Sequence, residues 1–236
     1  MCVIMYKPSN AKLPNRKTFE KCFKANPDGA GYMFVKDNKV IIHKGFSDLE
    51  NMLDSINSES VDFNKTALIC HFRISTQGGV NPSLTHPFAV SDNFADMRQI
   101  NATCNLALAH NGIISHCSNS RAKTYNDTME YIRRYVYPIT RGKAESLDDD
   151  LTIKLLKDRH LTGWNKFALM NANGKVVLVG DWRKKDGIFY SNLNWSQPPV
   201  IDNWKTPHNI NNFYSGGFFE NPDDSDDSED FVENIF

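Results

Sequence analysis

A cysteine directly after the initiator methionine is the first residue of this chain that could do chemistry. Initiator methionine is commonly removed when the next residue is small, and Cys2 is small. The mature chain would then begin with a thiol beside a free α-amine, whose pKa is about 8. Such an amine can accept the thiol proton, so a single residue would supply both nucleophile and base. The alternative is an ordinary buried cysteine in a strand.

Four later segments bring further reactive or charged side chains together in short motifs. Residues 71–79 read His-Phe-Arg-Ile-Ser-Thr-Gln-Gly-Gly, and residues 86–88 read His-Pro-Phe. Residues 109–114 read Ala-His-Asn-Gly-Ile-Ile, and residues 126–130 read Asn-Asp-Thr-Met-Glu. Each motif alone is weak, but the four in this order behind Cys2 form a specific pattern.

That pattern resembles the class II glutamine amidotransferase family of N-terminal-nucleophile hydrolases. Members typically begin Met-Cys and continue with His-x-Arg, His-Pro, His-Asn-Gly-Ile and an Asp-Thr-Glu-like helix start. Gly180-Asp181 and residues 189–192, Phe-Tyr-Ser-Asn, are similar to the late strands of stand-alone members. The resemblance covers roughly residues 2–195 and implies an α+β fold, a four-layer αββα sandwich of N-terminal-nucleophile hydrolase type.

The catalytic residues that the resemblance implies are Cys2, Asn111 and Gly112. Attack of the thiol on the glutamine side-chain amide creates an oxyanion. The family stabilises it with the side-chain amide of the Asn and the backbone N–H of the Gly. In other enzymes, loss of one such donor lowers the rate by about 100–1000-fold. The alternative for Asn111-Gly112 is a plain type I′ turn.

The implied substrate-binding residues are Arg73, Thr76, Gly78 and Asp127. Arg73 would bind the α-carboxylate of glutamine, because guanidinium offers paired donors, and Asp127 would bind the α-ammonium. Thr76 and Gly78 would line the glutamine loop. The alternatives are a surface arginine at a strand end and a helix-start acid favoured by the helix dipole.

These roles imply amide hydrolysis at the glutamine side chain with release of ammonia. We expect no cofactor and no metal, and His71, His86 and His110 would support loops, since the α-amine already serves as base. Class II domains usually precede a synthase domain, but only about 40 residues follow residue 195. We therefore expect a stand-alone domain that feeds a separate synthase partner; hydrolysis of another γ-glutamyl-like or amide substrate stays open.

The elements that must position these residues follow from local patterns. Hairpins and helices come in pairs, which favours an α+β arrangement over a doubly wound one. We expect a capping box at Ser47, a helix stop at Pro138 and a long functional loop over residues 74–103. The strands are expected over residues 2–6, 30–35, 39–43, 66–73, 106–109, 167–171, 175–180 and 188–191, and the helices over 17–25, 47–56, 127–137 and 146–158.

Composition sets the class of protein. The chain has 236 residues, 40% of them hydrophobic and 23% charged, which is enough apolar material for one sizeable core. No apolar run approaches the roughly 18–20 residues that span a bilayer, so we expect a cytoplasmic protein without a membrane partner. The five cysteines form no C-x-x-C pair, which argues against a disulfide framework. A zinc site assembled in space stays open.

The C-terminal segment differs in charge from the body. Residues 220–236 hold eight acids and no Lys or Arg, whereas residues 1–219 carry 27 bases and 20 acids, a net charge of +7. We expect an amidotransferase-like domain over 2–195, an extension over 196–219 and a disordered acidic tail over 220–236. The rival function is a non-catalytic binding protein on the same fold with a partner-docking tail. A charge of +7 is modest for a nucleic-acid binder, so we expect no nucleic acid; the oligomeric state stays open.

Overall fold

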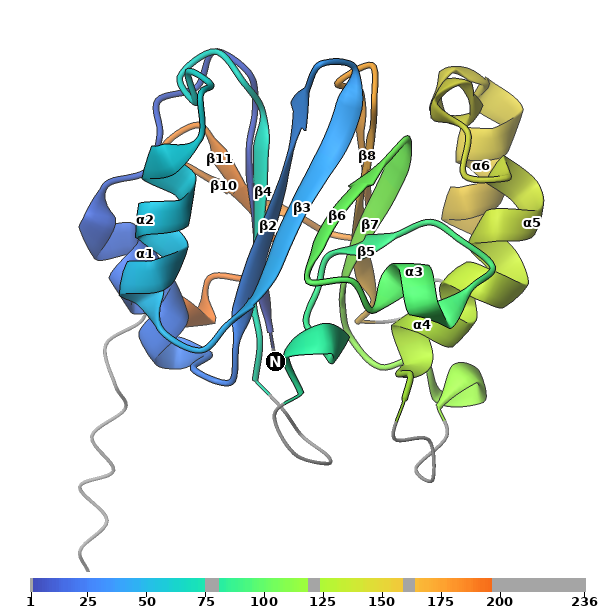
Figure 1. Ribbon diagram of the computed structural model, residues 1–236, viewed down its shortest axis with the longest axis horizontal. Coiled ribbons are helices and arrows are strands. Elements are labelled where there is room, and N and C mark those ends of the chain that lie inside the picture. Colours follow the sequence, from blue (N-terminus) through green and yellow to red (C-terminus); the bar gives the residue numbers. More distant parts are fainter. Residues whose placement is uncertain (1, 75–80, 119–123, 159–163, 197–236) are drawn as a thin grey trace, which may run out of the picture. The chain divides into compact units, whose positions relative to one another are not determined.

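The computed structural model describes residues 2–74, 81–118, 124–158 and 164–196, which form a mixed α+β unit with two antiparallel sheets (Figure 1). The first sheet has the strand order β10-β11-β1-β4-β2-β3-β6, and the second has the order β5-β7-β8-β9. The strands are β1 (Val3–Lys7), β2 (Ala30–Lys36), β3 (Lys39–Phe46), β4 (Leu68–Phe72), β5 (Phe88–Ala89), β6 (Asn101–Cys104), β7 (Leu106–Asn111), β8 (Lys166–Asn171), β9 (Val176–Val179), β10 (Arg183–Lys185) and β11 (Ile188–Tyr190).

Helices cover the outer face of each sheet (Figure 1). The longer helices are amphipathic and turn their apolar faces inward, as in Phe19 and Cys22 of α1. The helices are α1 (Arg16–Ala25), α2 (Leu49–Ser58), α3 (Phe94–Met97), α4 (Asp127–Tyr131), α5 (Tyr137–Thr140) and α6 (Asp150–Asp158), with a π-turn over Ile132–Val136 between α4 and α5. Short 3-10 turns lie at Pro82–Leu84, Ser115–Cys117, Ala144–Asp148 and Asn194–Ser196. In the described part of the chain, no helix is long and apolar enough to cross a membrane.

The two sheets pack face to face, and a layer of apolar side chains lies between them. Alternate residues of each strand face this layer, since side chains along a strand alternate between its two faces. The first sheet contributes large aliphatic side chains and the second contributes mostly alanines, which leaves little space between the sheets. The layer contains Ile4, Met33, Val40, Ile42, Ile69, Ala89, Ala107, Ala109, Ala168 and Met170.

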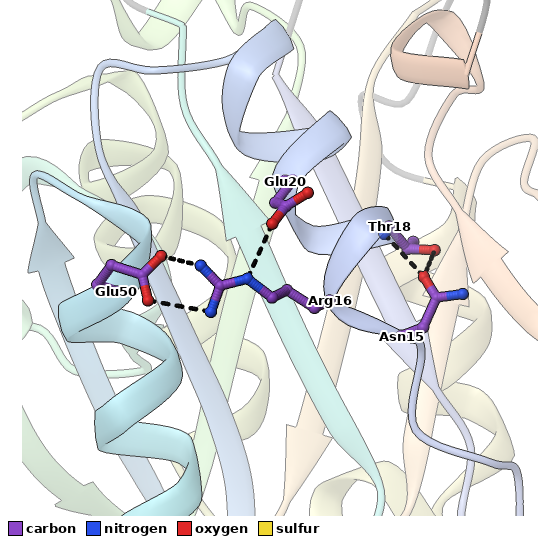
Figure 2. Close-up of polar contacts among 5 residues, drawn as sticks. All are labelled: Asn15, Arg16, Thr18, Glu20 and Glu50. Atoms are coloured by element: carbon purple, nitrogen blue, oxygen red, sulfur yellow. Dashed lines mark hydrogen bonds and ion pairs between the residues drawn. The ribbon is translucent and has the colours of Figure 1, made fainter.

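Polar contacts fix the start of α1 and its relation to α2 (Figure 2). The Asn15 side chain accepts the Thr18 backbone N–H at 3.0 Å, which caps the first turn. The Arg16 guanidinium donates to Glu20 one turn along, at 2.8 Å, and to both carboxylate oxygens of Glu50 on α2. These groups are exposed, so the pairs orient the helices more than they stabilise them.

Most predicted elements are present with small shifts at their ends. The β2–β3 hairpin turns at Asp37 and Asn38, whose φ angles of 51° and 54° fit the predicted turn. The β8–β9 hairpin turns through Gly174, with φ 83°. The N-cap of α2 is Asp48, which accepts the Asn51 N–H at 2.9 Å, so the capping box predicted at Ser47 is wrong by one residue.

Two larger predictions are wrong. Residues 74–103 are not one long loop, because the described part contains β5, α3 and β6 beside a 3-10 turn; each has only two to four residues, too few for a periodic pattern. Pro138 does not stop the helix, which ends at Arg141 with φ 53°. The preceding π-turn shifts the hydrogen-bond pattern, so Pro138 lies in the first turn of α5, where a missing N–H is tolerated.

Candidate active site

Cys2 directly precedes β1, an interior strand of the seven-stranded sheet, and is held at the end of that strand. Its thiol donates to the Ile74 carbonyl at 3.6 Å, and the Ile74 N–H donates to Sγ at 3.4 Å. The Asn192 side chain donates to the Cys2 carbonyl at 2.8 Å. Because contacts from two distant segments meet at this residue, the backbone and the sulfur of Cys2 both have fixed positions.

The surroundings of Cys2 keep its thiol protonated. Burial raises the pKa of the Cys2 thiol, while the Ile74 N–H and the Arg73 charge act in the opposite direction. A thiol with a raised pKa is a poor nucleophile until a base takes its proton. Chemistry at this sulfur therefore needs a base close by.

Arg73 follows β4 beside Cys2. The β1–β4 register pairs Val3 with Phe72, so its continuation brings Cys2 level with Arg73. The Arg73 N–H donates to the Gly29 carbonyl at 2.8 Å, and the Asp28 N–H donates to the Arg73 carbonyl at 3.0 Å. The loop between α1 and β2 thus holds the backbone of the half-buried Arg73, whose charge lies close enough to influence the Cys2 pKa.

Asn111 ends β7 on the face that looks toward the other sheet, two residues beyond Ala109. Its side chain is buried, and Nδ2 donates to Ser191 Oγ at 2.9 Å. The same oxygen accepts the Ile4 N–H at 2.8 Å. Ser191 therefore joins Asn111 of one sheet to the Cys2-bearing strand of the other.

Gly112 fits a position where a side chain would collide. Its φ is 149°, and a Cβ would lie 2.2 Å from Asn165 Oδ1. Asn111 pairs with Lys166 in the β7–β8 ladder and has no positive φ, so the type I′ turn offered as an alternative does not form here. The glycine is required by close approach of Asn165 and by its φ.

Asp127 begins α4 and holds the loop that follows Gly112. Its Oδ2 accepts the Ile114 N–H at 2.8 Å, and its Oδ1 accepts the Thr128 N–H at 2.8 Å. This is the helix-start role named as an alternative. Oδ1 also accepts from Thr128 Oγ1 at 3.3 Å, so Oδ2 is the oxygen that keeps a second lone pair for another donor. These hydrogen bonds connect Asp127 to Asn111 through the loop between β7 and α4.

Three buried histidines lie behind these residues. The His71 and His86 rings are 4.4 Å apart, and His71 Nε2 meets the His110 carbonyl at 3.1 Å. His110 Nδ1 contacts Thr128 Oγ1 at 2.9 Å, and Nε2 contacts Asn165 Oδ1 at 2.8 Å. Burial lowers all three pKa values, that of His71 to about 3, so the imidazoles are neutral at pH 7. His71 and His110 form hydrogen bonds, and His86 packs against the His71 ring.

Three residues of the candidate site are absent from the predicted set: Ser191, Asn192 and Asn165. Ser191 and Asn192 lie in the segment 189–192, which resembles late strands of the amidotransferase family. That resemblance implies no role for either residue. Asn165 has no local sequence signal, because its partners His110 and Gly112 lie more than 50 residues earlier.

The acidic tail predicted over residues 220–236 lies outside the residues that the structure describes. Thr76 and Gly78 lie outside the described residues. A cavity of about 270 Å³ lies beside α1 and another of about 190 Å³ lies between α1 and α2, and neither is lined by a predicted site residue. Within residues 2–74, 81–118, 124–158 and 164–196, no three His, Cys, Asp or Glu side chains are grouped to hold a metal ion.

Cys2 and Arg73 thus lie at neighbouring strand ends of the seven-stranded sheet, and Ser191 links that sheet to Asn111 at the end of β7. The loop between β7 and α4 connects Asn111 to Gly112 and Asp127. Comparison of the chain with protein-family models gives no match, and comparison with curated proteins gives none either.

Proposed function

We propose that this chain is an amidohydrolase of the class II glutamine amidotransferase type, built on an αββα sandwich of N-terminal-nucleophile hydrolase type. The observation that carries the proposal is that Cys2 and Arg73 lie level at the ends of the neighbouring strands β1 and β4, while Ser191 links β1 to Asn111 of the other sheet. A thiol, a guanidinium and an amide donor are what attack on the glutamine side chain requires.

In the proposed reaction, Cys2 attacks the side-chain carbonyl of glutamine after removal of Met1. The free α-amine accepts the thiol proton, which matters because burial raises the thiol pKa. Asn111 and the Gly112 N–H stabilise the oxyanion. The tetrahedral adduct collapses to a thioester and ammonia, with the amine returning its proton to the leaving nitrogen. Water then hydrolyses the thioester to glutamate, and the ammonia passes to a separate acceptor enzyme.

Substrate recognition would use two charged groups, Arg73 beside the nucleophile and Asp127 at the start of α4. Arg73 pairs with the α-carboxylate as a bidentate donor. Asp127 accepts from the α-ammonium with the second lone pair of Oδ2, since Oδ1 accepts from both the N–H and the hydroxyl of Thr128. Its backbone contacts also hold the loop after Gly112, so the same carboxylate would couple substrate binding to the oxyanion donors.

The experiment compares labelling and turnover in matched cysteine variants. Intact mass first establishes loss of Met1. A diazo-ketone analogue of glutamine should then alkylate Cys2, and Cys2→Ala should abolish both labelling and ammonia release. Cys104→Ala is the control, because burial raises the pKa of that half-buried thiol to about 12 and leaves it unreactive. Labelling that survives in Cys2→Ala, or no ammonia from glutamine with the Met1-free protein, contradicts the proposal.

Steady-state kinetics separates binding from chemistry. Arg73→Ala and Asp127→Ala should raise KM for glutamine, since each removes a charge that binds the ground state. Asn111→Ala should lower kcat by about 100-fold or more, because its partner charge exists only in the transition state. An Asn111→Ala effect on KM alone argues against the oxyanion role.

A further inference from the structure

Ser191 is a buried hydroxyl shared by the two halves of the candidate site. It follows β11 and is 1% exposed. Its Oγ accepts the Ile4 N–H at 2.8 Å and the Asn111 Nδ2–H at 2.9 Å, and its own N–H donates to the Ile4 carbonyl at 2.9 Å. Ile4 belongs to the seven-stranded sheet and Asn111 to the four-stranded sheet, so one oxygen is hydrogen-bonded to both sheets.

We propose that Ser191 is a positioning residue that fixes the Asn111 amide relative to Cys2 and thereby sets how well an oxyanion is stabilised. This inference rests on the proposed function and assigns a role to a residue outside the predicted set. Its chemical basis is that a hydroxyl can accept two hydrogen bonds and donate one. Two acceptances are in use, by Ile4 and Asn111, and the proton is available for a further partner.

The Asn111 amide shows what that proton can do. Its Oδ1 is buried and has no hydrogen-bond partner among the described residues. If the amide turns by 180°, Ser191 Oγ–H donates to Oδ1, and Nδ2 takes the place of the unpartnered oxygen with both hydrogens free for an oxyanion. The serine hydroxyl thus holds the amide in either orientation, whereas a methyl group at residue 191 holds neither.

If Ser191 had a purely structural role, Ser191→Ala would displace Cys2 as well as Asn111. Contacts that do not use Oγ also hold the Cys2 strand: the Ser191 N–H donates to the Ile4 carbonyl, and Asn192 donates to the Cys2 carbonyl at 2.8 Å. Both survive in Ser191→Ala. The Ile4 N–H and the Asn111 amide both lose an acceptor in this variant, but only Asn111 is expected to contact the oxyanion. The two remaining contacts keep Cys2 in place, so we expect the effect on catalysis to come from Asn111.

The test is a double-mutant cycle with Asn111. Ser191→Ala should lower kcat by about 10–100-fold with little change in KM, since misplacing one donor costs less than removing it. In the Asn111→Ala background the same change should cost nothing further, because Ser191 acts through that amide. Alkylation of Cys2 by iodoacetamide, which forms no oxyanion, should proceed at the wild-type rate.

Two further variants make the result specific. Ser196→Ala is the matched control, because that hydroxyl donates only to the nearby Leu193 carbonyl at 2.8 Å, and it should leave kcat unchanged. Ser191→Thr keeps the hydroxyl and should restore most of kcat. If Ser191→Ala does not fold, Ser191→Cys takes its place, since a thiol keeps the volume but is a weak hydrogen-bonding group.

Nuclear magnetic resonance separates this inference from the proposed function. The Asn111 side-chain amide signals, assigned by their loss in Asn111→Asp, should shift and exchange faster with solvent in Ser191→Ala and stay unchanged in Ser196→Ala. Shifted signals in a protein that does not hydrolyse glutamine support the hold of Ser191 on Asn111 and refute the proposed function. Unmoved signals, additive losses in the cycle, or slowed iodoacetamide alkylation overturn the inference.

Discussion

Two neighbouring rows of side chains cross the inner face of the seven-stranded sheet, two residues apart along each strand, and they differ in character. The apolar row is formed by Tyr6, Ile69, Met33 and Ile42. The basic row is formed by Ile4, His71, Gly31 and Lys44. Ile4 and His71 each lie two residues from a candidate site residue, Cys2 and Arg73, so the change from apolar to basic occurs next to the site.

The apolar row obeys the ordinary rule of protein interiors, whereas the basic row departs from it. Lys44 is 2% exposed and donates to the Met97 carbonyl at 2.6 Å, with its Nζ 4.0 Å from the centre of the Phe88 ring. His71 Nδ1 and both ring nitrogens of His86 have no hydrogen-bond partner among the described residues. Buried polar groups without partners cost about 1–3 kcal/mol each. The basic row therefore lowers stability beside the candidate site, which is where proteins commonly accept such a loss.

The largest expected effect comes from filling the one gap in the basic row. In Gly31→Ala, the new Cβ would lie 2.3 Å from the His86 carbonyl oxygen and 2.9 Å from Lys44 Cα. Both atoms are backbone, so neither can move aside cheaply, and we expect a loss of about 3 kcal/mol or more. Urea denaturation measures it through the transition midpoint.

Gly174→Ala is the control for the effect of the substitution itself. Gly174 has φ 83° with nothing within 4 Å of an added Cβ, so this variant carries backbone strain alone, about 1 kcal/mol. If Gly31→Ala costs no more than Gly174→Ala, the basic row is not closely packed against residue 86.

The second effect distinguishes the rows by pH. Burial lowers the pKa of Lys44 from 10.5 to about 6, so between these values the unfolded chain holds a proton that the folded chain lacks. Stability therefore rises with pH through this window. Between pH 7 and pH 9, we expect the free energy of unfolding of the wild type to rise relative to Lys44→Met by about 1.4 kcal/mol per pH unit.

Urea denaturation at pH 7, 8 and 9 measures that difference in slope. Lys65→Met is the control, because this exposed ammonium stays in water in the folded chain, and its slope should equal that of the wild type. Equal slopes for Lys44→Met and the wild type would mean that Lys44 keeps its proton when folded, and the contrast between the rows would lose its electrostatic part.

Local chemistry explains which parts of the fold could be predicted from the sequence. The β2–β3 hairpin was predictable because Asp37-Asn38 supplies its own turn between two apolar runs. The β6 strand was not, since Asn101–Cys104 is ordered by pairing with β3 about 60 residues earlier and has no periodicity of its own. Pro138 misled because a π-turn, which leaves no recognised pattern in sequence, precedes it.

The candidate site divides in the same way. The motifs around Cys2, Arg73 and Asn111 indicated residues at the ends of β1, β4 and β7, which Ser191 and strand pairing connect. They did not reveal Ser191, because a serine after a short strand looks the same whether its hydroxyl meets water or an amide 80 residues away. They also did not reveal the basic row, because Gly31, Lys44 and His71 become neighbours only through strand pairing.

The smallest expected effect tests whether the two rows are independent. Ile42 is 1% exposed and lies in the apolar row, two residues before Lys44 on β3. Ile42→Val removes one methylene, for which we expect a loss of about 1 kcal/mol. Burial of an aliphatic group involves no proton, so this loss should be the same at pH 5, 7 and 9, in contrast to the Lys44→Met difference. Urea denaturation of Ile42→Val and of the wild type in the same three buffers measures this loss.

A loss that changes with pH would mean that the cavity left at Ile42 reaches the Lys44 side chain and alters its burial. The two rows would then form one coupled layer, and the boundary beside the candidate site would have to be drawn farther from Cys2.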